Sequence, residues 1–210
     1  MTHFETLKKG AHLMGAELSD DVILTLVRYL ELLQKWNKAY NLTAIRDPEQ
    51  MINLHLFDSL ATLPFIEGND VIDVGTGPGL PGMVLAICLP EKNFTLLDSN
   101  GKKTRFLTQV KMELGITNVT VLNERVEKHA LQGHYDHVIS RAFASLTDMI
   151  NWTLPLPNEK GNFLAMKGVY PESEIQQLPE GVEIQDIFPL KVTNVEAERH
   201  LVRMVRKGNK

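Results

Sequence analysis

The residues with the clearest chemical potential lie in a glycine-rich segment, VIDVGTGPGLPG, at positions 71–82. Its alternating glycines are Gly75, Gly77 and Gly79. They would let a ligand approach the backbone closely, and a following helix would direct its free N–H groups at an anionic group of that ligand. The dinucleotide-binding fingerprint needs a glycine where Leu80 stands, and Asp73 lies just before the first glycine. This combination favours S-adenosylmethionine over NAD as the cofactor.

A second acid, Asp98, follows the next apolar segment at a distance that suits both hydroxyls of a cofactor ribose. Further on, Arg125, Val126 and Glu127 follow a third apolar segment, where they could bracket an adenine ring. Asp98 alone does not separate NAD from an adenosyl methyl donor, so the distinction depends on Asp73 and the glycine spacing. A nucleoside triphosphatase is disfavoured, because no Gly-Lys-Ser/Thr sequence follows the loop.

The acceptor side of the site is indicated by Arg141, which directly follows the apolar segment HVIS. A charge so close to a buried strand needs a partner. No Asn- or Asp-Pro-Pro-aromatic tetrapeptide occurs here, which argues against methylation of an exocyclic amino group, and the single cysteine, Cys88, falls inside a predicted helix and is poorly placed as a nucleophile. Direct transfer to a ring nitrogen such as guanine N7, which carries no proton, remains, although this elimination leaves the acceptor atom open.

Helical periodicity dominates the N-terminal third of the chain. Residues 19–38 carry an apolar stripe at helical spacing. A weaker helix precedes them, and another is predicted over residues 48–66, with Pro48 in its first turn. We therefore expect residues 1–65 to form a helical cap that packs on a catalytic domain, residues 66–210.

The remainder of the chain alternates short apolar strands with helical stretches. The expected strands are VIDV, FTLLD, VTVL, HVIS and FLAM, and residues 102–115 form an amphipathic helix between two of them. This alternation predicts an α/β fold with a Rossmann-like, doubly wound, mostly parallel sheet. The last two apolar segments, 182–192 and 200–207, are expected to close the sheet as an antiparallel edge pair. Ligands of such sheets bind at the carboxyl ends of the strands.

Length and composition fit one globular domain of 210 residues with a single cysteine, which agrees with a reducing compartment. No apolar run reaches membrane-spanning length, and polar residues interrupt the N-terminal segment, so we expect no secretory signal, no membrane partner and a cytoplasmic location. No pair of histidines accompanied by an acid has metal-ligand spacing, so no metal is expected.

Charge is distributed unevenly along the chain. The net charge of −4 argues against a broadly basic coat for nucleic acid. Basic residues nevertheless gather at Lys35, Lys38 and Arg46, and the C-terminal segment RHLVRMVRKGNK carries five Lys or Arg and no acid. Each group alone is also compatible with a solvated surface.

The segments WNKAYNLTAIRDP, HLFDS, IDVGTGPGLPG, LLDS, RVE, ISRAFAS and MKG occur in the order found in one family. In these segments the chain resembles the bacterial small-subunit (16S) ribosomal RNA guanine-N7 methyltransferases, formerly called glucose-inhibited division protein B. The resemblance covers essentially residues 5–206 and implies a class I S-adenosylmethionine-dependent methyltransferase fold with an N-terminal helical cap. It also implies transfer to guanine N7 in the decoding-region loop, with 16S rRNA, the small subunit or an assembly intermediate as partner and S-adenosylhomocysteine as product.

The same resemblance implies roles for single residues. It places the methyl donor against Gly75 and Leu80, the ribose near Asp98, and the adenine near Val126 and Glu127. It assigns Arg141 to the donor or the acceptor pocket, and the residues expected around the reaction cleft are Arg125, His55, Asp58, Lys167, Arg199 and His200. The residues expected to contact RNA are Lys35, Lys38, Arg46, Arg199, His200 and Arg203. His55 could equally be a packing histidine.

Three other functions stay open on the sequence alone. A small-molecule methyltransferase would use the same cofactor loop, and a non-catalytic adenosine-ligand sensor or assembly factor would use both the loop and the basic residues. An NAD-dependent dehydrogenase is the weakest of the three, because the glycine spacing disfavours it. A monomer is favoured, but the oligomeric state is not determined by the sequence.

Overall fold

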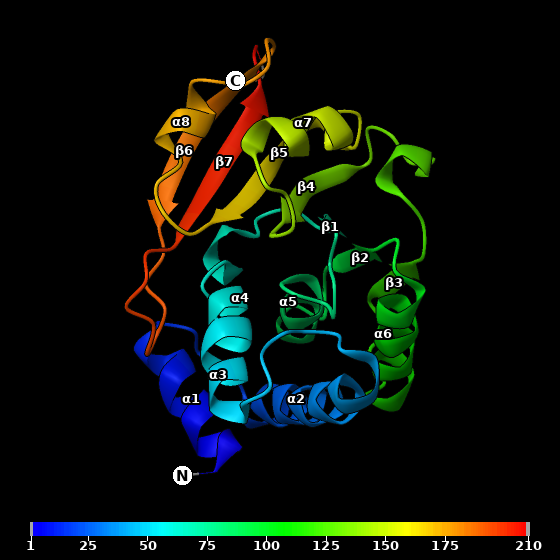
Figure 1. The fold of residues 1–210 in the computed structure, drawn as a ribbon, viewed down its shortest axis with the longest axis vertical. Helices are drawn as coiled ribbons and strands as arrows, with labels where there is room; N and C mark the ends of the chain where they lie inside the picture. The colour runs from blue at the N-terminus through cyan, green and yellow to red at the C-terminus, as the bar shows by residue number, and fades with distance from the viewer. Residues whose placement is uncertain (1, 209–210) are drawn as a thin grey trace.

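The computed structural model describes residues 2–208, and within this range seven strands form one sheet in the order β3-β2-β1-β4-β5-β7-β6 (Figure 1). β1 to β5 run parallel, whereas β7 lies antiparallel to both β5 and β6. The strands are β1 (Asp70–Val74), β2 (Asn93–Leu97), β3 (Val119–Leu122), β4 (Tyr135–Ser140), β5 (Pro157–Lys167), β6 (Val182–Pro189) and β7 (His200–Arg206). The mostly parallel sheet with an antiparallel C-terminal pair is thereby confirmed.

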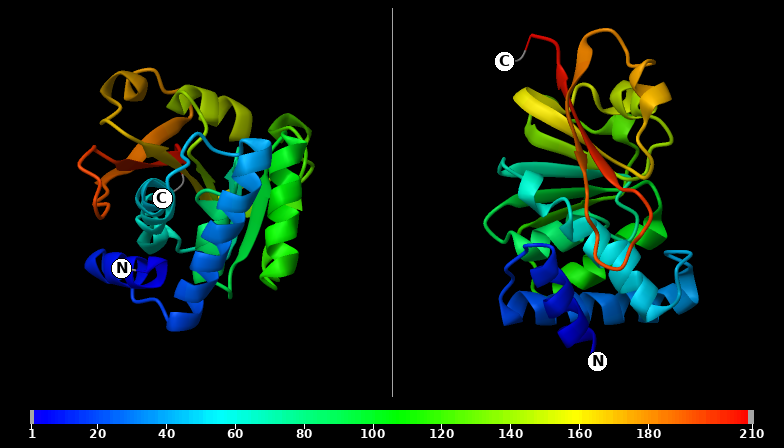
Figure 2. Two further views of the ribbon diagram at one scale, coloured as in Figure 1. Left: turned by 60° about the horizontal axis from the view of Figure 1, so that its bottom comes forward. Right: turned by 90° about the vertical axis from the view of Figure 1, so that its left-hand side faces the viewer.

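Helices cover both faces of this sheet (Figures 1 and 2). The α-helices are α1 (His3–Leu13), α2 (Asp20–Tyr40), α3 (Pro48–Met51), α4 (Asp58–Leu60), α5 (Gly82–Cys88), α6 (Gly101–Glu113), α7 (Leu146–Thr153) and α8 (Glu172–Ile175). A π-helical turn, Ile52–Phe57, joins α3 to α4, and single 3-10 turns occur at Leu63–Phe65 and Val126–Lys128.

Alternating strand residues feed two separate hydrophobic layers, as the pleat requires. Val71 and Ile139 belong to the layer that contains α1 to α6, whereas their chain neighbours Ile72 and Val138 belong to the layer beneath α7. Because the N-terminal helices and the sheet share the first layer, the cap has no hydrophobic core of its own among the described residues. The division of the chain at residue 65 therefore stays a prediction about organisation.

The second helix forms close to the predicted bounds. Ser19 caps α2 with its side-chain oxygen, which accepts from the backbone N–H of Val22, and the helix ends where Asn41 adopts a left-handed conformation with φ 51°. Its apolar stripe is buried in the first layer. α2 packs against α5 and α6 (Figure 2). It is therefore positioned to support the loops that precede these two helices.

The helix predicted over residues 48–66 is less regular than the pattern indicates. It is divided into α3, the π-helical turn and α4, and a 3-10 turn follows. Ser59 donates to the carbonyl oxygen of His55 (2.6 Å), and Thr62 donates to that of Ser59 (2.7 Å). Such side-chain bonds compete with regular helical hydrogen bonding. The widened turn contains His55 and leads directly into Asp58, two residues of the predicted cleft.

Cys88 is the last residue of α5 and packs half-buried against the first hydrophobic layer, where burial raises the pKa of its thiol to about 12. It is therefore held as a neutral, unreactive thiol. No helix between residues 2 and 208 is long and apolar enough to cross a membrane.

Candidate active site

Two buried carboxylates hold the glycine-rich loop between β1 and α5. Asp73 accepts hydrogen bonds at Oδ2 from the Thr76 hydroxyl (2.7 Å) and from the backbone N–H of Gly82 (2.8 Å). Asp98, at the end of β2, accepts from the backbone N–H of Gly77 at 2.9 Å. The loop is thus held at Thr76, Gly77 and Gly82 by acids that the sequence places at strand ends.

The three alternating glycines serve different purposes. Gly75 has φ +70° and a Cβ there would lie 2.6 Å from Cβ of Ala142, in the loop after β4. Gly79 has φ +103° and a Cβ there would lie 2.6 Å from Cβ of Met83 in α5. Gly77 also has a positive φ, +60°, but its nearest neighbour is the Lys103 Nζ at 3.9 Å. Gly79 therefore permits helix packing, whereas Gly77 leaves open space beside a cation.

The first of three connected hollows, of about 330 Å³, lies at the ends of β1, β2 and β4. Its wall includes Asp98, Val126, Glu127 and Phe143. Asp98 is 7% exposed, and Lys103 lies 3.9 Å from its Oδ2. The hollow combines apolar surface with a carboxylate and backbone groups, which suits a purine ring and a ribose.

A second hollow, of about 220 Å³, lies over the glycine loop. Gly75, Lys103 and Ala142 line both the first hollow and this one. Leu80, 2% exposed, forms part of its floor, and Gly77 lines it as well. These shared walls connect the hollow beside Asp98 with the space above the glycine loop.

The third hollow, of about 490 Å³, is built around Asp58 in α4 and is here called the acceptor hollow. Asp58 Oδ2 lies 3.2 Å from Nη1 of Arg141, and its Oδ1 accepts from Nε of Arg199 at 2.9 Å. The Arg141 Nη1 also donates to the carbonyl oxygen of Leu54 (3.2 Å). One carboxylate, 6% exposed, thus holds two guanidinium groups and leaves a net positive charge in the hollow.

His55 lines both the second hollow and the acceptor hollow. Its Nδ1 lies 3.1 Å from the carbonyl oxygen of Leu54, and its Nε2 lies 2.8 Å from the hydroxyl of Thr43. Burial, with Arg141 nearby, lowers the pKa of His55 to about 4. The imidazole is therefore neutral at physiological pH, and both of its nitrogens already have hydrogen-bond partners.

Lys167 and His200 complete the acceptor hollow from β5 and β7. The Lys167 ammonium group lies 2.8 Å from Glu174 Oε2 and donates to the carbonyl oxygen of Ala144 (3.1 Å). His200 Nδ1 lies 2.8 Å from the carbonyl oxygen of Gly168. Because a carbonyl only accepts, Nδ1 carries the proton when this ring is neutral.

The structure separates some residues that the sequence groups together. Arg125, predicted at the reaction cleft, is exposed and lines the first hollow with Val126, and it does not line the acceptor hollow. Asp73, in β1, and Gly79, in the loop itself, are predicted to bind the cofactor but line none of the three hollows. Their contribution is to hold the loop, as the hydrogen bonds and packing above indicate.

Among the predicted RNA contacts, Arg203 is buried. Its side chain is 10% exposed, with Nη2 3.4 Å from Glu67 and the guanidinium 5.3 Å from the ring centroid of Phe188. This burial disfavours a phosphate contact, and the ring of Phe188 supplies packing for the guanidinium group. Lys35, Lys38 and Arg46 are exposed, as RNA contact requires. Lys210, the last basic residue of the C-terminal segment, lies outside the described residues.

Sequence reasoning missed Tyr29 in α2. Its hydroxyl donates to the carbonyl oxygen of Pro78 in the glycine loop (2.8 Å), and the side chain is fully buried. The helical stripe of α2 gives no signal for this contact, because tyrosine at such a position is indistinguishable from an ordinary core residue. The sequence also gives no signal for Glu174, because only the fold brings its carboxylate to Lys167.

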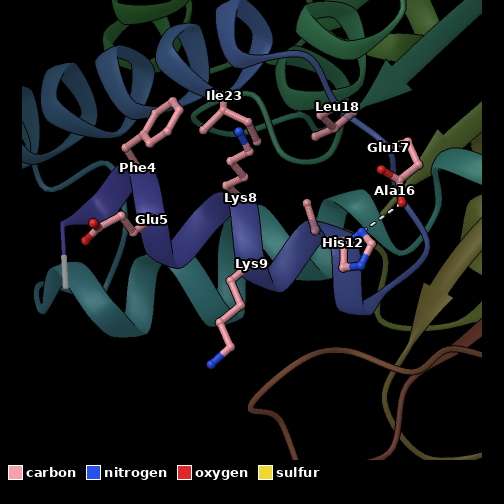
Figure 3. A pocket seen from close by; sticks show the side chains of 10 residues that line it. Phe4, Glu5, Lys8, Lys9, His12, Ala16, Glu17, Leu18 and Ile23 are labelled. Carbon is pink, nitrogen blue, oxygen red and sulfur yellow. Dashed lines mark hydrogen bonds and ion pairs between the residues drawn. The ribbon is translucent and has the colours of Figure 1, made fainter.

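Another cavity, of about 400 Å³, lies between α1 and the start of α2 (Figure 3). Phe4, Leu18 and Ile23 contribute apolar walls, and Lys8 and His12 lie at its rim. It shares no lining residue with the three hollows at the strand ends. Among residues 2–208, no group of three or more His, Cys, Asp or Glu side chains is placed to hold a metal ion.

Comparison with solved structures shows the class of this fold. A S-adenosylmethionine-dependent methyltransferase from Aquifex aeolicus matches with a TM-score of 0.59 and 18% identity, covering 76% of this chain and 94% of that one. TYW2 from M. jannaschii, solved in complex with AdoMet, matches with a TM-score of 0.52 and 16% identity, covering 69% of this chain and 73% of that one. The fold is that of the class I S-adenosylmethionine-dependent methyltransferases.

Sequence comparison narrows this class to one family. The family model described as rRNA small subunit methyltransferase G matches residues 23–202. A relative of that name from Marinomonas sp. is 76% identical over 99% of this chain and 100% of its own length, and one from Erwinia tasmaniensis is 54% identical over 91% and 94%. The chain belongs to the rRNA small subunit methyltransferase G family, which confirms the resemblance found in the sequence.

Proposed function

We propose that this protein transfers a methyl group from S-adenosylmethionine to N7 of a guanine in the decoding-region loop of 16S rRNA. Family membership supports small-subunit rRNA as the substrate. The observation that carries the proposal is the continuous run of three hollows, because shared wall residues link the space beside Asp98, the glycine loop and the cationic acceptor hollow. A donor and an acceptor could therefore meet where Arg141 and His55 line two hollows at once.

The residues around the first two hollows fit the methyl donor. A Cβ at Gly75 would clash with Ala142, and Gly77 keeps its side of the second hollow open. Asp98 would accept from the ribose hydroxyls, and Val126 with Glu127 would flank the adenine. When bound, S-adenosylmethionine supplies a methyl group activated by a positively charged sulfur. The chain's own contribution is to hold the donor so that this methyl group faces the acceptor hollow.

The acceptor hollow suits an atom that already has a lone pair. Arg141 and Arg199 can donate to guanine O6 or to phosphate oxygens, and Asp58 keeps both guanidinium groups in place. Guanine N7 carries no proton, so transfer to it needs positioning and no general base. The state of His55 agrees with this, because its low pKa and its two hydrogen bonds leave it a positioning role.

Contacts to the rest of the RNA are proposed for the rim of the acceptor hollow. Arg46 and Thr43 belong to the loop that follows α2, and Thr43 lines the hollow. Lys35 and Lys38 are exposed on the last two turns of the same helix. His200 and Lys167 also line the acceptor hollow. Arg125, at the first hollow, is proposed to contact an RNA phosphate or the cofactor near its adenine rather than the guanine itself.

Mass spectrometry of 16S rRNA tests the proposal. RNA from cells that lack this protein should have lost one N7-methylguanosine, and the purified protein with S-adenosylmethionine should restore it at the same nucleotide. Loss of a methyl group at another atom would contradict the N7 assignment. An unchanged rRNA, together with methylation of free metabolites by the purified protein, would favour a small-molecule methyltransferase. Binding of donor and RNA without any product would favour a non-catalytic binding protein.

A further inference from the structure

Two large apolar side chains stand exposed in the loop that joins β5 to α8. Val169 is 75% exposed and Tyr170 is 51% exposed. The loop begins directly after Lys167, the last residue of β5, and both Lys167 and Gly168 line the acceptor hollow. The exposed pair therefore lies at the carboxyl edge of the sheet, where ligands of this fold bind.

Contacts to β7 hold this loop in one arrangement. The ring of Tyr170 meets the ring of His200 edge to face, with centroids 5.7 Å apart and an interplanar angle of 86°. His200 Nδ1 donates to the carbonyl oxygen of Gly168 (2.8 Å), and the backbone N–H of Glu172 donates to that of Tyr170 (3.0 Å). The aromatic ring is thus fixed in position while half of its surface stays in contact with water.

The charges beside the loop indicate what could cover it. Arg199, which precedes His200, and Arg141 share one carboxylate, so the adjoining hollow is cationic. An apolar protein segment would gain nothing from these guanidinium groups, whereas a nucleotide offers a flat apolar base for the ring and a phosphate for the cations. Charge complementarity therefore favours RNA as the occupant.

We propose that Tyr170, flanked by Val169 and supported by His200, is a stacking platform for an unpaired base of the RNA substrate next to the target guanine. This inference rests on the proposed function. A guanine buried in the acceptor hollow must leave its stack, and its neighbour then loses a stacking partner. The Tyr170 ring replaces that partner at a position that is already ordered in the protein, so little side-chain entropy is lost on binding.

Steady-state methylation of small-subunit particles and of naked 16S rRNA, both from cells lacking the protein, tests the platform with four variants. Base stacking on an aromatic ring predicts that Tyr170→Ala raises KM for RNA at least about fivefold. Tyr170→Phe should resemble the wild type, because it keeps the ring. Tyr170→Leu should resemble Tyr170→Ala, because an apolar side chain without a ring does not stack. Met112→Ala removes another exposed apolar side chain, 73% exposed on α6, and should have no effect.

Calorimetric titration with S-adenosylmethionine and thermal unfolding distinguish binding from folding. All four variants should bind the donor and unfold as the wild type does. An unchanged KM for RNA in Tyr170→Ala would overturn the platform, as would full activity of Tyr170→Leu or a parallel loss of donor affinity in Tyr170→Ala. A wild-type protein that methylates neither RNA would instead contradict the proposed function, so the two failures are distinguishable.

Discussion

At the residue scale, Asp58 decides the geometry of the acceptor hollow. Arg141 comes from the loop after β4 and Arg199 from the segment before β7, and the carboxylate of α4 binds both. Removing Asp58 would leave two guanidinium groups without their carboxylate, whereas removing either arginine leaves the other one paired with Asp58. The sequence predicts all three at the cleft through the family resemblance, but it does not predict that one acid holds two cations.

Replacing Arg141 with alanine should separate catalysis from folding. We expect kcat for rRNA methylation to fall roughly 100-fold, because a misplaced acceptor loses the near-attack arrangement. The fold should persist, since Arg199 still pairs with Asp58 and the Arg141 side chain is 30% exposed. Single-turnover methylation measures the loss, and Arg28→Ala, which removes an exposed arginine of α2, is the control. Normal single-turnover activity of Arg141→Ala would remove this residue from the mechanism.

Asp73 makes stability depend on pH. Burial raises its pKa from 3.8 to about 6, against the hydrogen bonds from Thr76 and Gly82 that favour the charged form. The folded protein thus holds this proton more tightly than the unfolded chain does. Its stabilising contribution is fully present below the ordinary pKa and is lost as the pH rises through about 6. A shift of this size corresponds to a contribution on the order of 3 kcal/mol.

Asp73→Asn isolates this effect, because the amide keeps an acceptor oxygen for Thr76 and Gly82 and does not titrate. Urea unfolding of both proteins from about pH 4 to pH 7 should show the free energy of unfolding of the wild type decreasing relative to that of the variant. A difference that stays constant across this range would show that Asp73 has its ordinary pKa in the folded protein.

Arg203 shows why the sequence alone does not reveal the role of each basic residue in the C-terminal segment. The two last strands were predictable, and so was their antiparallel pairing. β7, however, lies between β5 and β6, so its residues are paired on both sides. Whether a basic residue of this segment faces solvent depends on that insertion and on the strand register. Arg199 lies before the strand and reaches the hollow, whereas Arg203 lies within it and packs on Phe188.

At the scale of elements, α2 supports the glycine loop from outside the sheet. The Tyr29 hydroxyl reaches the carbonyl oxygen of Pro78, and burial raises the pKa of Tyr29, so the phenol stays a neutral donor. Helical periodicity predicts α2 well, because its stripe and N-cap are local features. The interrupted helix around His55 was not predictable, because it depends on hydroxyl bonds that a periodic pattern does not encode.

Tyr29→Phe tests whether this helix preorganises the loop. Loss of the hydroxyl leaves the Pro78 carbonyl buried without its donor, and we expect a cost of about 1–3 kcal/mol in unfolding free energy. Donor affinity should fall as well, because the loop is less firmly held. Calorimetry with S-adenosylmethionine and thermal unfolding provide the two measurements, and Tyr40→Phe changes an exposed tyrosine of the same helix as a control. Equal donor affinity in wild type and Tyr29→Phe would limit the contact to stability.

At the scale of the whole molecule, the charge distribution shapes how RNA can be bound. The chain carries a net charge of −4, so long-range attraction to RNA does not come from the protein as a whole. Cationic groups instead line the acceptor hollow, where Arg141, Lys167 and Arg199 lie, and two more lysines, Lys35 and Lys38, are exposed near the end of α2. A local cationic rim on an acidic protein favours docking in one orientation and limits nonspecific binding elsewhere.

The salt dependence of RNA affinity tests whether the exposed lysines of α2 contact the RNA. Lys35 and Lys38 are exposed three residues apart on α2 and therefore lie on one face of the helix. If both contact phosphates, Lys35→Gln with Lys38→Gln should reduce the slope of log affinity against log salt by about one per lost contact. Lys160→Gln, an exposed change in the first half of β5 and so away from the carboxyl edge, should leave the slope unchanged. Equal slopes for the double variant and the wild type would mean that the phosphate contacts come from other cationic groups.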